Sequence, residues 1–434
     1  MPDDIGLAAA LLGLDGFRVL RVIEMPSELT VVVETVRERA FCRECGCRAE
    51  AHDRMLVELR DLPCFGRPVR LAWQKRRWRC REQLCSAKTW TEEGEAAPSR
   101  LLLTQRAGME VTRQVGELAR PVNTVAMENG LAWWTTMDAV RHYGQPLIDA
   151  PDRVGLVRAM GLDETKWLSA DREHSTRYVS SIVDLDRCTV VDLIEGNAAT
   201  DIGAWCGKQT SLFLHAVQVV ATDLTESYRR GIQGYLDHAL RVADPFHVVR
   251  VANRTLDQVR RRVQNQMLGH RGRKKDPLFR IRKLLAMGAE RLSEQGHERL
   301  LLGLRVGDPD DEVVGAWLAK ESVRDVYLTD HVEEASTLLE KVITGCQEDA
   351  VPEVRSLGRT LQRWRPEILN HHRSGASNGP TEGQNLAIKK VKRCGHGFRD
   401  FENYRLRVLL FAGGVEWPHR PRPPAIGSTL PTQM

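Results

Sequence analysis

The sequence predicts an α/β core that carries a helical insertion and is preceded by a small β zinc ribbon and an α-helical domain. Three observations support this prediction. Cysteine pairs lie in a strand-rich N-terminal segment, a helix-rich segment follows them, and short β-rich runs then alternate with helices. Alternation of this kind is typical of α/β domains. With 434 residues, two to four domains are expected.

The N-terminal segment, residues 1–97, is predicted to be the zinc ribbon. Its β-rich runs at 17–23 and 29–35 are joined by a Pro-Ser turn, and two cysteine pairs follow. Two tight turns can present four thiolates to zinc in a tetrahedron. The alternative is a set of reduced, buried cysteines, and Cys47 competes with Cys45 as a ligand. The predicted zinc ligands are Cys42, Cys45, Cys80 and Cys85.

Composition narrows the class of protein. Acidic residues, not basic ones, precede the apolar run at 7–14, so we expect no secretory signal. No apolar run approaches about 20 residues, so we expect no transmembrane helix. Cysteines in a cytoplasmic protein stay reduced, which favours metal binding over disulfides. The net charge is +5, and the clustering of that charge matters more than its sum.

Residues 98–150 are predicted to form a helix-turn-helix domain. Apolar residues recur at helical spacing from 101 to 118, with Thr104 as a candidate cap. A short helix, an Asn-Gly turn and a third helix at 133–143 follow. This is the pattern whose last helix enters the major groove of DNA. Any packed three-helix unit has a similar sequence, so its position beside a basic ribbon carries the prediction.

Residues 151–249 are predicted to form the first part of the α/β core. The expected order is three strands, a helix, a strand, a helix over 224–242, and a strand. Two of the strands are expected to end in an aspartate, at Asp163 and at Asp223. Adjacent strand ends can bring two such carboxylates within a few ångströms of each other. Each aspartate taken alone could equally begin a turn or cap a helix.

Glu382 is the third candidate carboxylate. It lies in the polar stretch 377–385, behind a Gly-Pro pair and ahead of a basic helical run, so we expect it early in a helix. Taken alone it could simply complement the helix dipole. Together with the two aspartates it could hold two divalent cations about 3.5–4 Å apart. Asp244, which also follows a strand and lies close to His247, is a rival ligand.

Several blocks of the chain, in this order and spacing, resemble insertion-sequence transposases of the ISL-three family. The resemblance implies a ribonuclease-H-like catalytic core with a DDE triad, which carries over to Asp163, Asp223 and Glu382. In two places the chain departs from the family: the second cysteine pair has a longer spacer, and a proline follows Asp244. The role of Asp244 is therefore open, and we expect it, with His247, to support the metal ligands. The matching blocks are the four cysteines, the helix-turn-helix, 161–164, 222–228, 244–248, 377–385 and 397–407.

The resemblance implies a DNA transposase that binds terminal inverted repeats and catalyses metal-dependent strand cleavage and strand transfer. It further implies two Mg²⁺ (or Mn²⁺) ions, double-stranded DNA as both inverted repeat and target, and a homodimer or larger assembly. A cytoplasmic, nucleoid-associated protein with no membrane partner is expected. The alternatives are a zinc-ribbon and helix-turn-helix regulator with an inactive core, and a metal-dependent nuclease without strand transfer. The presence of all three acids favours the transposase.

The 159 positions from Asp223 to Glu382 require an insertion, predicted as helical and basic over 250–372, before the last part of the core at 373–416. Positions 250–285 hold twelve Lys/Arg against two Asp/Glu, which suits phosphate contact, although a solvated helix face has the same composition. Trp364 is expected in the core of the insertion, with a flipped base as an alternative partner. Residues 417–434 are predicted to be a disordered tail. The predicted DNA-contacting residues are Lys75, Arg76, Arg77, Arg79, Arg141, Arg260, Arg261, Arg262, Arg271, Arg273, Lys274, Lys275, Lys389, Lys390 and Arg393.

Overall fold

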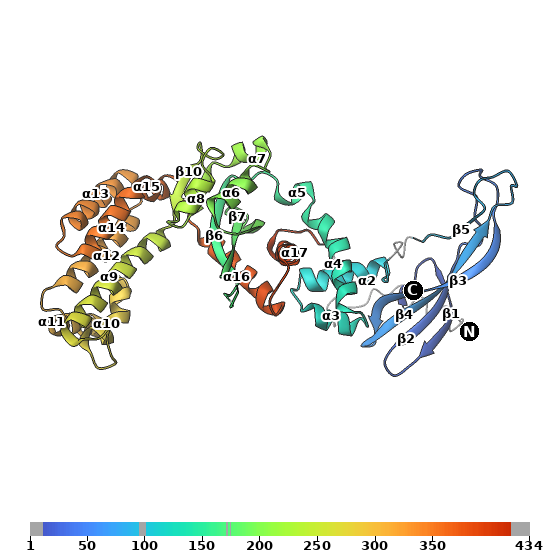
Figure 1. Cartoon of the computed structure of the whole chain (residues 1–434), viewed down its shortest axis with the longest axis horizontal. Helices are drawn as coiled ribbons and strands as arrows, with labels where there is room; N and C mark the ends of the chain where they lie inside the picture. Colours follow the sequence, from blue (N-terminus) through green and yellow to red (C-terminus); the bar gives the residue numbers. More distant parts are fainter. Residues whose placement is uncertain (1–11, 95–100, 171, 174, 418–434) are drawn as a thin grey trace, which may run out of the picture. The chain divides into compact units, whose positions relative to one another are not determined.

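The computed structural model describes residues 12–94, 101–170, 172–173 and 175–417 (Figure 1). Contacts divide the chain into two units, the first made of residues 1–153 and 387–434 and the second of residues 154–386. All but the first residue of the predicted tail at 417–434, and residues 7–11 of the apolar run at 7–14, lie outside the described residues. Within the described residues, no helix is both long enough and apolar enough to cross a membrane.

The first unit begins with a twisted sheet in the order β1-β2-β4-β3, with β5 paired to the far end of β4. The hairpin of β3 and β4 turns at Phe65 and Gly66, both with positive φ, as a two-residue hairpin loop requires. The sheet buries one face, on which Val31, Leu71 and Trp73 are fully covered. The strands are β1 (Phe17–Glu24), β2 (Leu29–Thr35), β3 (Glu50–Cys64), β4 (Arg67–Arg79) and β5 (Thr89–Thr91).

Three helices follow the sheet where the sequence predicted them. The Thr104 side chain caps the first by accepting the Ala107 backbone NH, and Gly130 takes a positive φ in the turn before the third. Buried Asp61 of β3 accepts hydrogen bonds from Thr104 and Arg106, which ties the helices to the sheet. The helices of this unit are α2 (Gln105–Gly116), α3 (Val122–Glu128), α4 (Trp133–Ile148) and α17 (Phe401–Ala412), and α5 (Pro151–Val154) lies at its boundary.

The second unit contains a five-stranded sheet in the order β10-β9-β6-β7-β8. β6, β7 and β8 form an antiparallel meander, and β9 and β10 run parallel to β6. Apolar side chains of the sheet pack against α6, α7 and α8. The elements are β6 (Ala159–Leu168), β7 (Arg177–Asp184), β8 (Thr189–Glu195), α6 (Ala199–Cys206), α7 (Ser211–Ala216), β9 (Val219–Thr222), α8 (Glu226–Gly231) and β10 (Leu240–Ala243).

Two element predictions in this unit were wrong. The helix expected over 224–242 is only the six-residue α8. It ends at Gly231, and Gly234 takes a positive φ of 82°, which a helix cannot continue through. β6 does not end at Asp163 but continues to Leu168, because β7 pairs with it along its whole length. The strand ladder with β9 nevertheless ends at Leu162, so Asp163 still lies at the end of the parallel part of the sheet.

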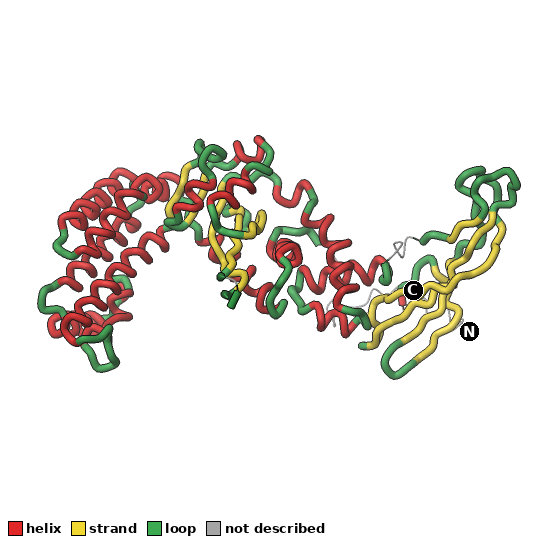
Figure 2. Tube along the Cα trace, in the orientation of Figure 1, coloured by secondary structure: helices red, strands yellow, loops and turns green. Residues whose placement is uncertain are grey.

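After β10 the second unit is helical (Figure 2). The helices between β10 and residue 374 share one continuous apolar core, as expected for an insertion. Trp364 is 5% exposed within that core, so the alternative of a flipped base on its ring is wrong. The helices are α9 (Pro245–Leu268), α10 (Pro277–Ala286), α11 (Glu294–Gly307), α12 (Glu312–Asp325), α13 (Val332–Glu348), α14 (Pro352–Arg363), α15 (Arg365–Ser374) and α16 (Gly379–Cys394), with single 3₁₀ turns η1 (Ala289–Arg291) and η2 (Val326–Leu328).

Candidate metal and DNA sites

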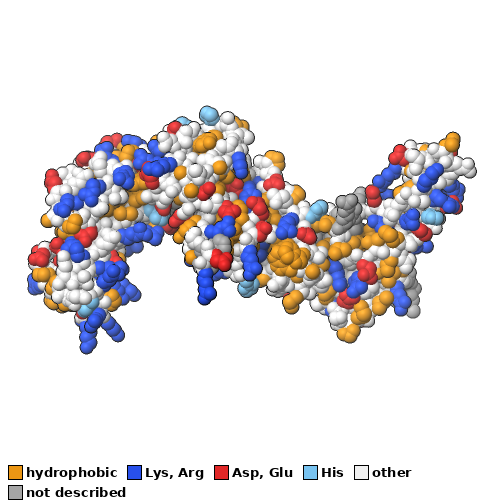
Figure 3. Space-filling view, viewed as in Figure 1, with side chains coloured by type: hydrophobic (Ala, Val, Ile, Leu, Met, Phe, Trp, Pro, Cys, Tyr) orange, Lys and Arg blue, Asp and Glu red, His pale blue; other side chains and the backbone are white. Residues whose placement is uncertain are grey.

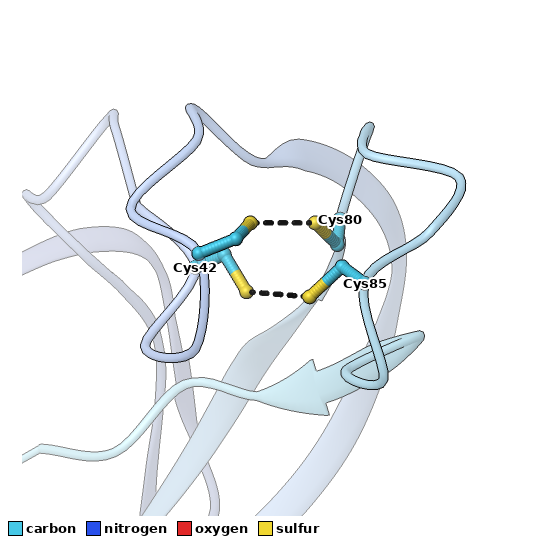
Figure 4. A group of neighbouring side chains, drawn as sticks. Cys42, Cys80 and Cys85 are labelled. Carbon is cyan, nitrogen blue, oxygen red and sulfur yellow. Dashed lines mark hydrogen bonds between the residues drawn. The ribbon is translucent and has the colours of Figure 1, made fainter.

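Four cysteines converge at the far end of the first sheet. The Sγ atoms of Cys42 and Cys85 are 3.7 Å apart, and those of Cys45 and Cys80 are 3.4 Å apart (Figure 4). All four Sγ atoms lie within 4.8 Å of one another. A tetrahedron of Zn–S bonds of about 2.3 Å has S–S edges of about 3.8 Å. The donor set and its spacing therefore fit a structural zinc ion.

Local backbone geometry presents these thiols. Gly46 takes a positive φ of 70°, and the Cys42 NH donates to the Cys47 carbonyl, which closes a tight turn around the first pair. The backbone NH of Cys47 lowers the pKa of Cys45 to about 7, and the thiolate is the form that binds metal. Cys47 itself is exposed and does not belong to the four-cysteine group.

Three aspartates lie at the same level of the second sheet. Leu162 of β6, Thr222 of β9 and Ala243 of β10 are in register across the parallel ladder. The next residue of each strand is an aspartate: Asp163, Asp223 and Asp244. Because neighbouring strands lie about 4.8 Å apart, one edge of the sheet carries three adjacent carboxylates.

The electrostatics of the first two carboxylates suit a divalent cation. Burial raises the pKa of Asp163, and the negative charge of Asp223 raises it further. Burial likewise raises the pKa of Asp223. The buried Oδ1 of Asp223 has no hydrogen-bond partner among the described residues. Buried, mutually repelling oxygens are suitable ligands for a hard divalent cation, and an ion there would satisfy the unpaired atom.

Glu382 comes from the first turn of α16, as predicted. Its carboxylate, an oxygen of Asp244 and a ring nitrogen of His247 lie within 4.8 Å of one another. His247 in turn interacts electrostatically with Asp163 and Asp223. These five side chains therefore form one charged cluster, although the geometric group that contains Glu382 includes Asp244 rather than the other two aspartates.

Gly161 allows α16 to lie this close to the sheet. A Cβ at this position would overlap the Thr381 hydroxyl and lie 2.7 Å from Oδ1 of Asn378. The Asn378 side-chain amide donates to the Leu162 carbonyl at 3.2 Å, so the start of α16 is fastened to β6 beside the aspartate. A glycine two residues before Asp163 is thus a packing requirement of the site.

Asn385 fixes the orientation of Asp163. The hydroxyls of Thr165 and Ser181 both donate to its Oδ1 at 3.0 Å. The side-chain oxygen is thereby the acceptor, so its Nδ2 donates to Oδ2 of Asp163 at 2.6 Å. Sequence reasoning had placed Asn385 near Glu382 but missed this role. One helical turn separates the two residues on α16, and this spacing is the signal that could have found it.

Asp244 differs from Asp223 because both of its carboxylate oxygens have partners. Oδ1 accepts the Asn378 backbone NH at 2.8 Å, and Oδ2 is 3.2 Å from Nδ1 of His247. Although burial raises the pKa of Asp244, the His247 and Asn378 hydrogen bonds lower it overall. The hydrogen bond between His247 and Asp244 also raises the pKa of His247. Both oxygens of Asp244 thus have partners within the protein, whereas Oδ1 of Asp223 has none among the described residues.

The fifteen predicted DNA-contacting residues fall into two groups. The first group is engaged within the protein. Arg76 is 8% exposed and pairs with Glu34. Arg260 is 4% exposed and pairs with Asp257. Arg262 is paired with two glutamates, Glu312 and Glu353. These three arginines are therefore withdrawn from the predicted DNA surface, because their charge already serves the fold.

The second group is open to solvent or partly so. Lys and Arg side chains gather at the loop between α9 and α10 (Figure 3). Four residues of this group form exposed ion pairs with nearby carboxylates: Arg77, Arg79, Arg141 and Arg261. Because exposed ion pairs contribute little to stability, these arginines can exchange the carboxylate for a DNA phosphate. The remaining members are Lys75, Arg271, Arg273, Lys274, Lys275, Lys389, Lys390 and Arg393.

Several known proteins are similar in sequence to this chain. A family model described as transposase, of the ISL3 type of DDE transposases, matches residues 160–408. The transposase for insertion sequence element IS1001 of Bordetella parapertussis is 24% identical over 423 residues, 93% of this chain and 97% of the relative. The transposase for IS1557 of Mycobacterium tuberculosis is 26% identical over 317 residues, 68% of each chain. A Lactococcus lactis protein named ATP-dependent protease matches only 57 residues, 13% of this chain, at 44% identity.

Proposed function

The chain belongs to the ISL3 family of transposases, and we propose that it binds the terminal inverted repeats of an insertion sequence and catalyses DNA strand cleavage and strand transfer. The proposed catalytic residues are Asp163, Asp223 and Glu382. One observation carries the assignment of the first two: each directly follows the last register pair of the parallel β6–β9 ladder, and the two share a buried, charged environment. The unpaired Oδ1 of Asp223 supports its choice over Asp244.

The fold proposal is a ribonuclease-H-like core in two parts, residues 151–249 and 373–416, interrupted by the helical insertion 250–372. The sheet supports this proposal: it is an antiparallel three-stranded meander, extended beyond β6 by two strands that run parallel to β6. The glutamate of such a core must come from the helix that follows the insertion, and α16 supplies it. The zinc ribbon, 1–97, and the helix-turn-helix domain, 98–150, are proposed to read the inverted repeats.

The residues of this chain prepare the site for the reaction. Two Mg²⁺ or Mn²⁺ ions, when bound by the three carboxylates, would supply charge neutralisation for in-line phosphoryl transfer. Asn385 holds the Asp163 carboxylate in a fixed orientation. Asp244 accepts the Asn378 backbone NH at the start of α16 and thereby positions the turn that carries Glu382. Positioning of this kind contributes much of the catalysis in phosphoryl transfer.

The DNA surface is proposed to comprise the exposed basic residues of the ribbon, of the α9–α10 loop and of the second half of α16. Charge clustering in the loop at 271–275 supports contact with phosphates, and predicts binding that weakens steeply with salt. Two element ends must be held together for transposition, so a homodimer or larger assembly on DNA is part of the proposal.

The test uses the full-length protein, a labelled duplex that ends in the inverted repeat, target DNA and Mg²⁺. Wild type, Asp163→Ala and Glu382→Ala should all bind the duplex, and only wild type should yield cleaved and joined products. Asp186→Ala, an exposed turn residue, is the matched control and should retain activity. Binding without cleavage by wild type would favour the regulator, and cleavage without joining would favour the nuclease. Undiminished cleavage by either catalytic variant would redirect the assignment to Asp244.

A further inference from the structure

A cavity of about 540 Å³ lies within the first unit, between the helices α3 and α4 and the segment that leads into α17. Its volume is within the range of small-molecule and cofactor sites in proteins. The proposed catalytic cluster belongs to the other unit, so the cavity has no part in that site. We call it the tryptophan pocket, and its main lining residues are Trp133, Trp134, Met137, Phe398, Arg399 and Arg407.

One wall of the tryptophan pocket is aromatic. Trp133 and Trp134 occupy the first turn of α4, and their rings meet edge to face with centroids 4.7 Å apart. Trp134 is 68% exposed, although a tryptophan ring is the side chain with the most apolar surface to bury. An exposed aromatic surface beside a cavity indicates a binding site for a flat, apolar group.

The buried end of the tryptophan pocket holds an arginine without a counter-charge. Arg407 is 3% exposed. Its Nη2 donates to the Arg120 carbonyl at 3.0 Å, and its guanidinium lies over the Phe398 ring at 5.0 Å. Within the described residues its Nε has no hydrogen-bond partner, and no carboxylate forms an ion pair with it. Burial lowers the pKa of Arg407 to about 10.

An unpartnered, buried donor is costly unless a ligand satisfies it. The cavity beside it is large enough to admit one, and the ligand must offer a hydrogen-bond acceptor. Exposed Arg399 adds positive charge at the rim, next to the exposed carboxylate of Asp400. Arg141 braces the wall by donating to Asn403 of α17 at 3.1 Å and to Asp138 at 3.0 Å. The ligand chemistry is thus a flat ring with acceptor atoms and an attached anion.

We propose that the tryptophan pocket binds one unstacked nucleotide of DNA, with its base against Trp134, its acceptor edge toward Arg407 and its phosphate toward Arg399. Stacking on tryptophan and bonding of acceptor atoms by arginine are common means of holding an exposed base. The choice of DNA as partner rests on the proposed function. The N-terminal end of the third helix in a helix-turn-helix domain is also the end that faces DNA, and both tryptophans lie there.

The test measures binding of the full-length protein to duplexes in Ca²⁺ without Mg²⁺, which separates binding from cleavage. One duplex is fully paired, a second has a single unpaired 2-aminopurine nucleotide, and a third has an abasic nucleotide at that position. Wild type should bind the second about 5- to 100-fold more tightly than the other two, and stacking should quench the 2-aminopurine fluorescence. Trp134→Ala should lose both effects, the first measured as the ratio of its affinities for the unpaired and the paired duplex.

Met127→Ala is the matched control, because Met127 is 78% exposed on α3 but does not line the pocket. It should keep the preference and the quench. Arg399→Ala should reduce the slope of log affinity against log salt by about one for the unpaired duplex alone. The proposal would be overturned if wild type bound the unpaired duplex no more tightly than the paired one. It would also be overturned if Trp134→Ala quenched the 2-aminopurine fluorescence as fully as wild type does.

A last arm distinguishes failure of the pocket from failure of the proposed function. Deoxynucleoside monophosphate and inorganic phosphate are titrated against the protein, with Trp134→Ala alongside. The nucleotide should bind wild type more tightly than phosphate does, and Trp134→Ala should abolish the difference. Tight binding to paired duplex without any effect of Trp134→Ala refutes only the pocket. Absence of duplex binding with retained nucleotide binding refutes only the proposed DNA function.

Discussion

The cysteine cluster of the first unit and the acidic cluster of the second are assembled in opposite ways. Each cysteine pair belongs to one short turn, and the two pairs are brought together by a single sheet. The acidic cluster draws on β6, β9, the start of α9 and α16, between positions 163 and 382. The cysteines are held by the backbone of the turns that carry them, whereas the side chains of Asp163 and Asp244 are held by asparagines.

This difference indicates that the cysteine cluster, and not the acidic cluster, needs its metal ion to keep its structure. Four thiolates repel one another, so the cysteine turns need zinc to stay together. The acidic site keeps its shape through neutral hydrogen bonds and a buried core, so removal of a divalent cation should leave the fold intact. The two sites should therefore respond differently to the same chelator.

The largest expected effect is loss of zinc from the ribbon. Cys85→Ser, or a strong zinc chelator, should disorder the end of the first sheet and reduce DNA affinity by about 100-fold or more, because structural zinc contributes folding free energy directly. Bound zinc is measured by mass spectrometry and DNA affinity by titration. The acidic centre should keep its fold, as judged by protection of α16 amides from hydrogen exchange.

Cys47→Ser is the matched control for the cysteine cluster. It changes a thiol in the same turn that lies outside the four-cysteine group, so zinc content and DNA affinity should remain those of wild type. A zinc content reduced by Cys47→Ser but not by Cys45→Ser would exchange the two ligands. One zinc-free preparation with full DNA affinity would remove the structural role of the ion.

The contrast also explains what sequence could predict. Cys42, Cys45, Cys80 and Cys85 were found from local spacing alone, since two short turns define the donor set. The aspartates were found because buried strands precede them, although the full extent of β6 was missed. Sequence does not tell which strand pairs with which, so the continuation of β6 along β7 had no local signal.

Other parts of the site depend on contacts between distant segments. The bond from the Asn378 NH to Asp244 joins positions 134 residues apart, and no local pattern predicts it. Arg76 and Arg260 have the same local composition as their exposed neighbours, but the fold turns them inward against Glu34 and Asp257. Charge clustering therefore predicted a basic region without separating the structural arginines from the exposed ones.

A smaller effect is expected where the acidic site is positioned without direct contact with the ions. Gly161→Ala would push the start of α16 away from β6, because the added methyl overlaps Thr381 and Asn378. A displacement of about 1 Å can reduce catalysis about 100-fold, so cleavage should fall about 10- to 100-fold with DNA affinity unchanged. Cleavage of the labelled inverted-repeat duplex measures the first quantity, and titration measures the second.

Gly345→Ala is the control for this variant. Gly345 lies in α13 with open space around it, so alanine should be neutral or stabilise the helix by about 1 kcal/mol. Restoration of cleavage in Gly161→Ala by a second change, Thr381→Ala, would support the steric argument, since it removes one of the two overlapping groups. Full activity of Gly161→Ala would show that α16 is not held by this contact.

The smallest expected effect is on stability and depends on pH. Burial raises the pKa of Asp223 above its unfolded value, which is about 3.9. The folded state then holds the proton more tightly than the unfolded state, so this residue lowers stability as pH rises from the unfolded to the folded pKa. In metal-free protein, Asp223→Asn should gain on the order of 1–2 kcal/mol at pH 7 and almost nothing near pH 3.5. Chemical denaturation at the two pH values measures the difference, with exposed Asp186→Asn as the control.

Mg²⁺ should stabilise wild type but not Asp223→Asn, since the ion and the substitution relieve the same buried charge. A loss of stability in metal-free Asp223→Asn at pH 7 would mean that the protein itself already satisfies this carboxylate.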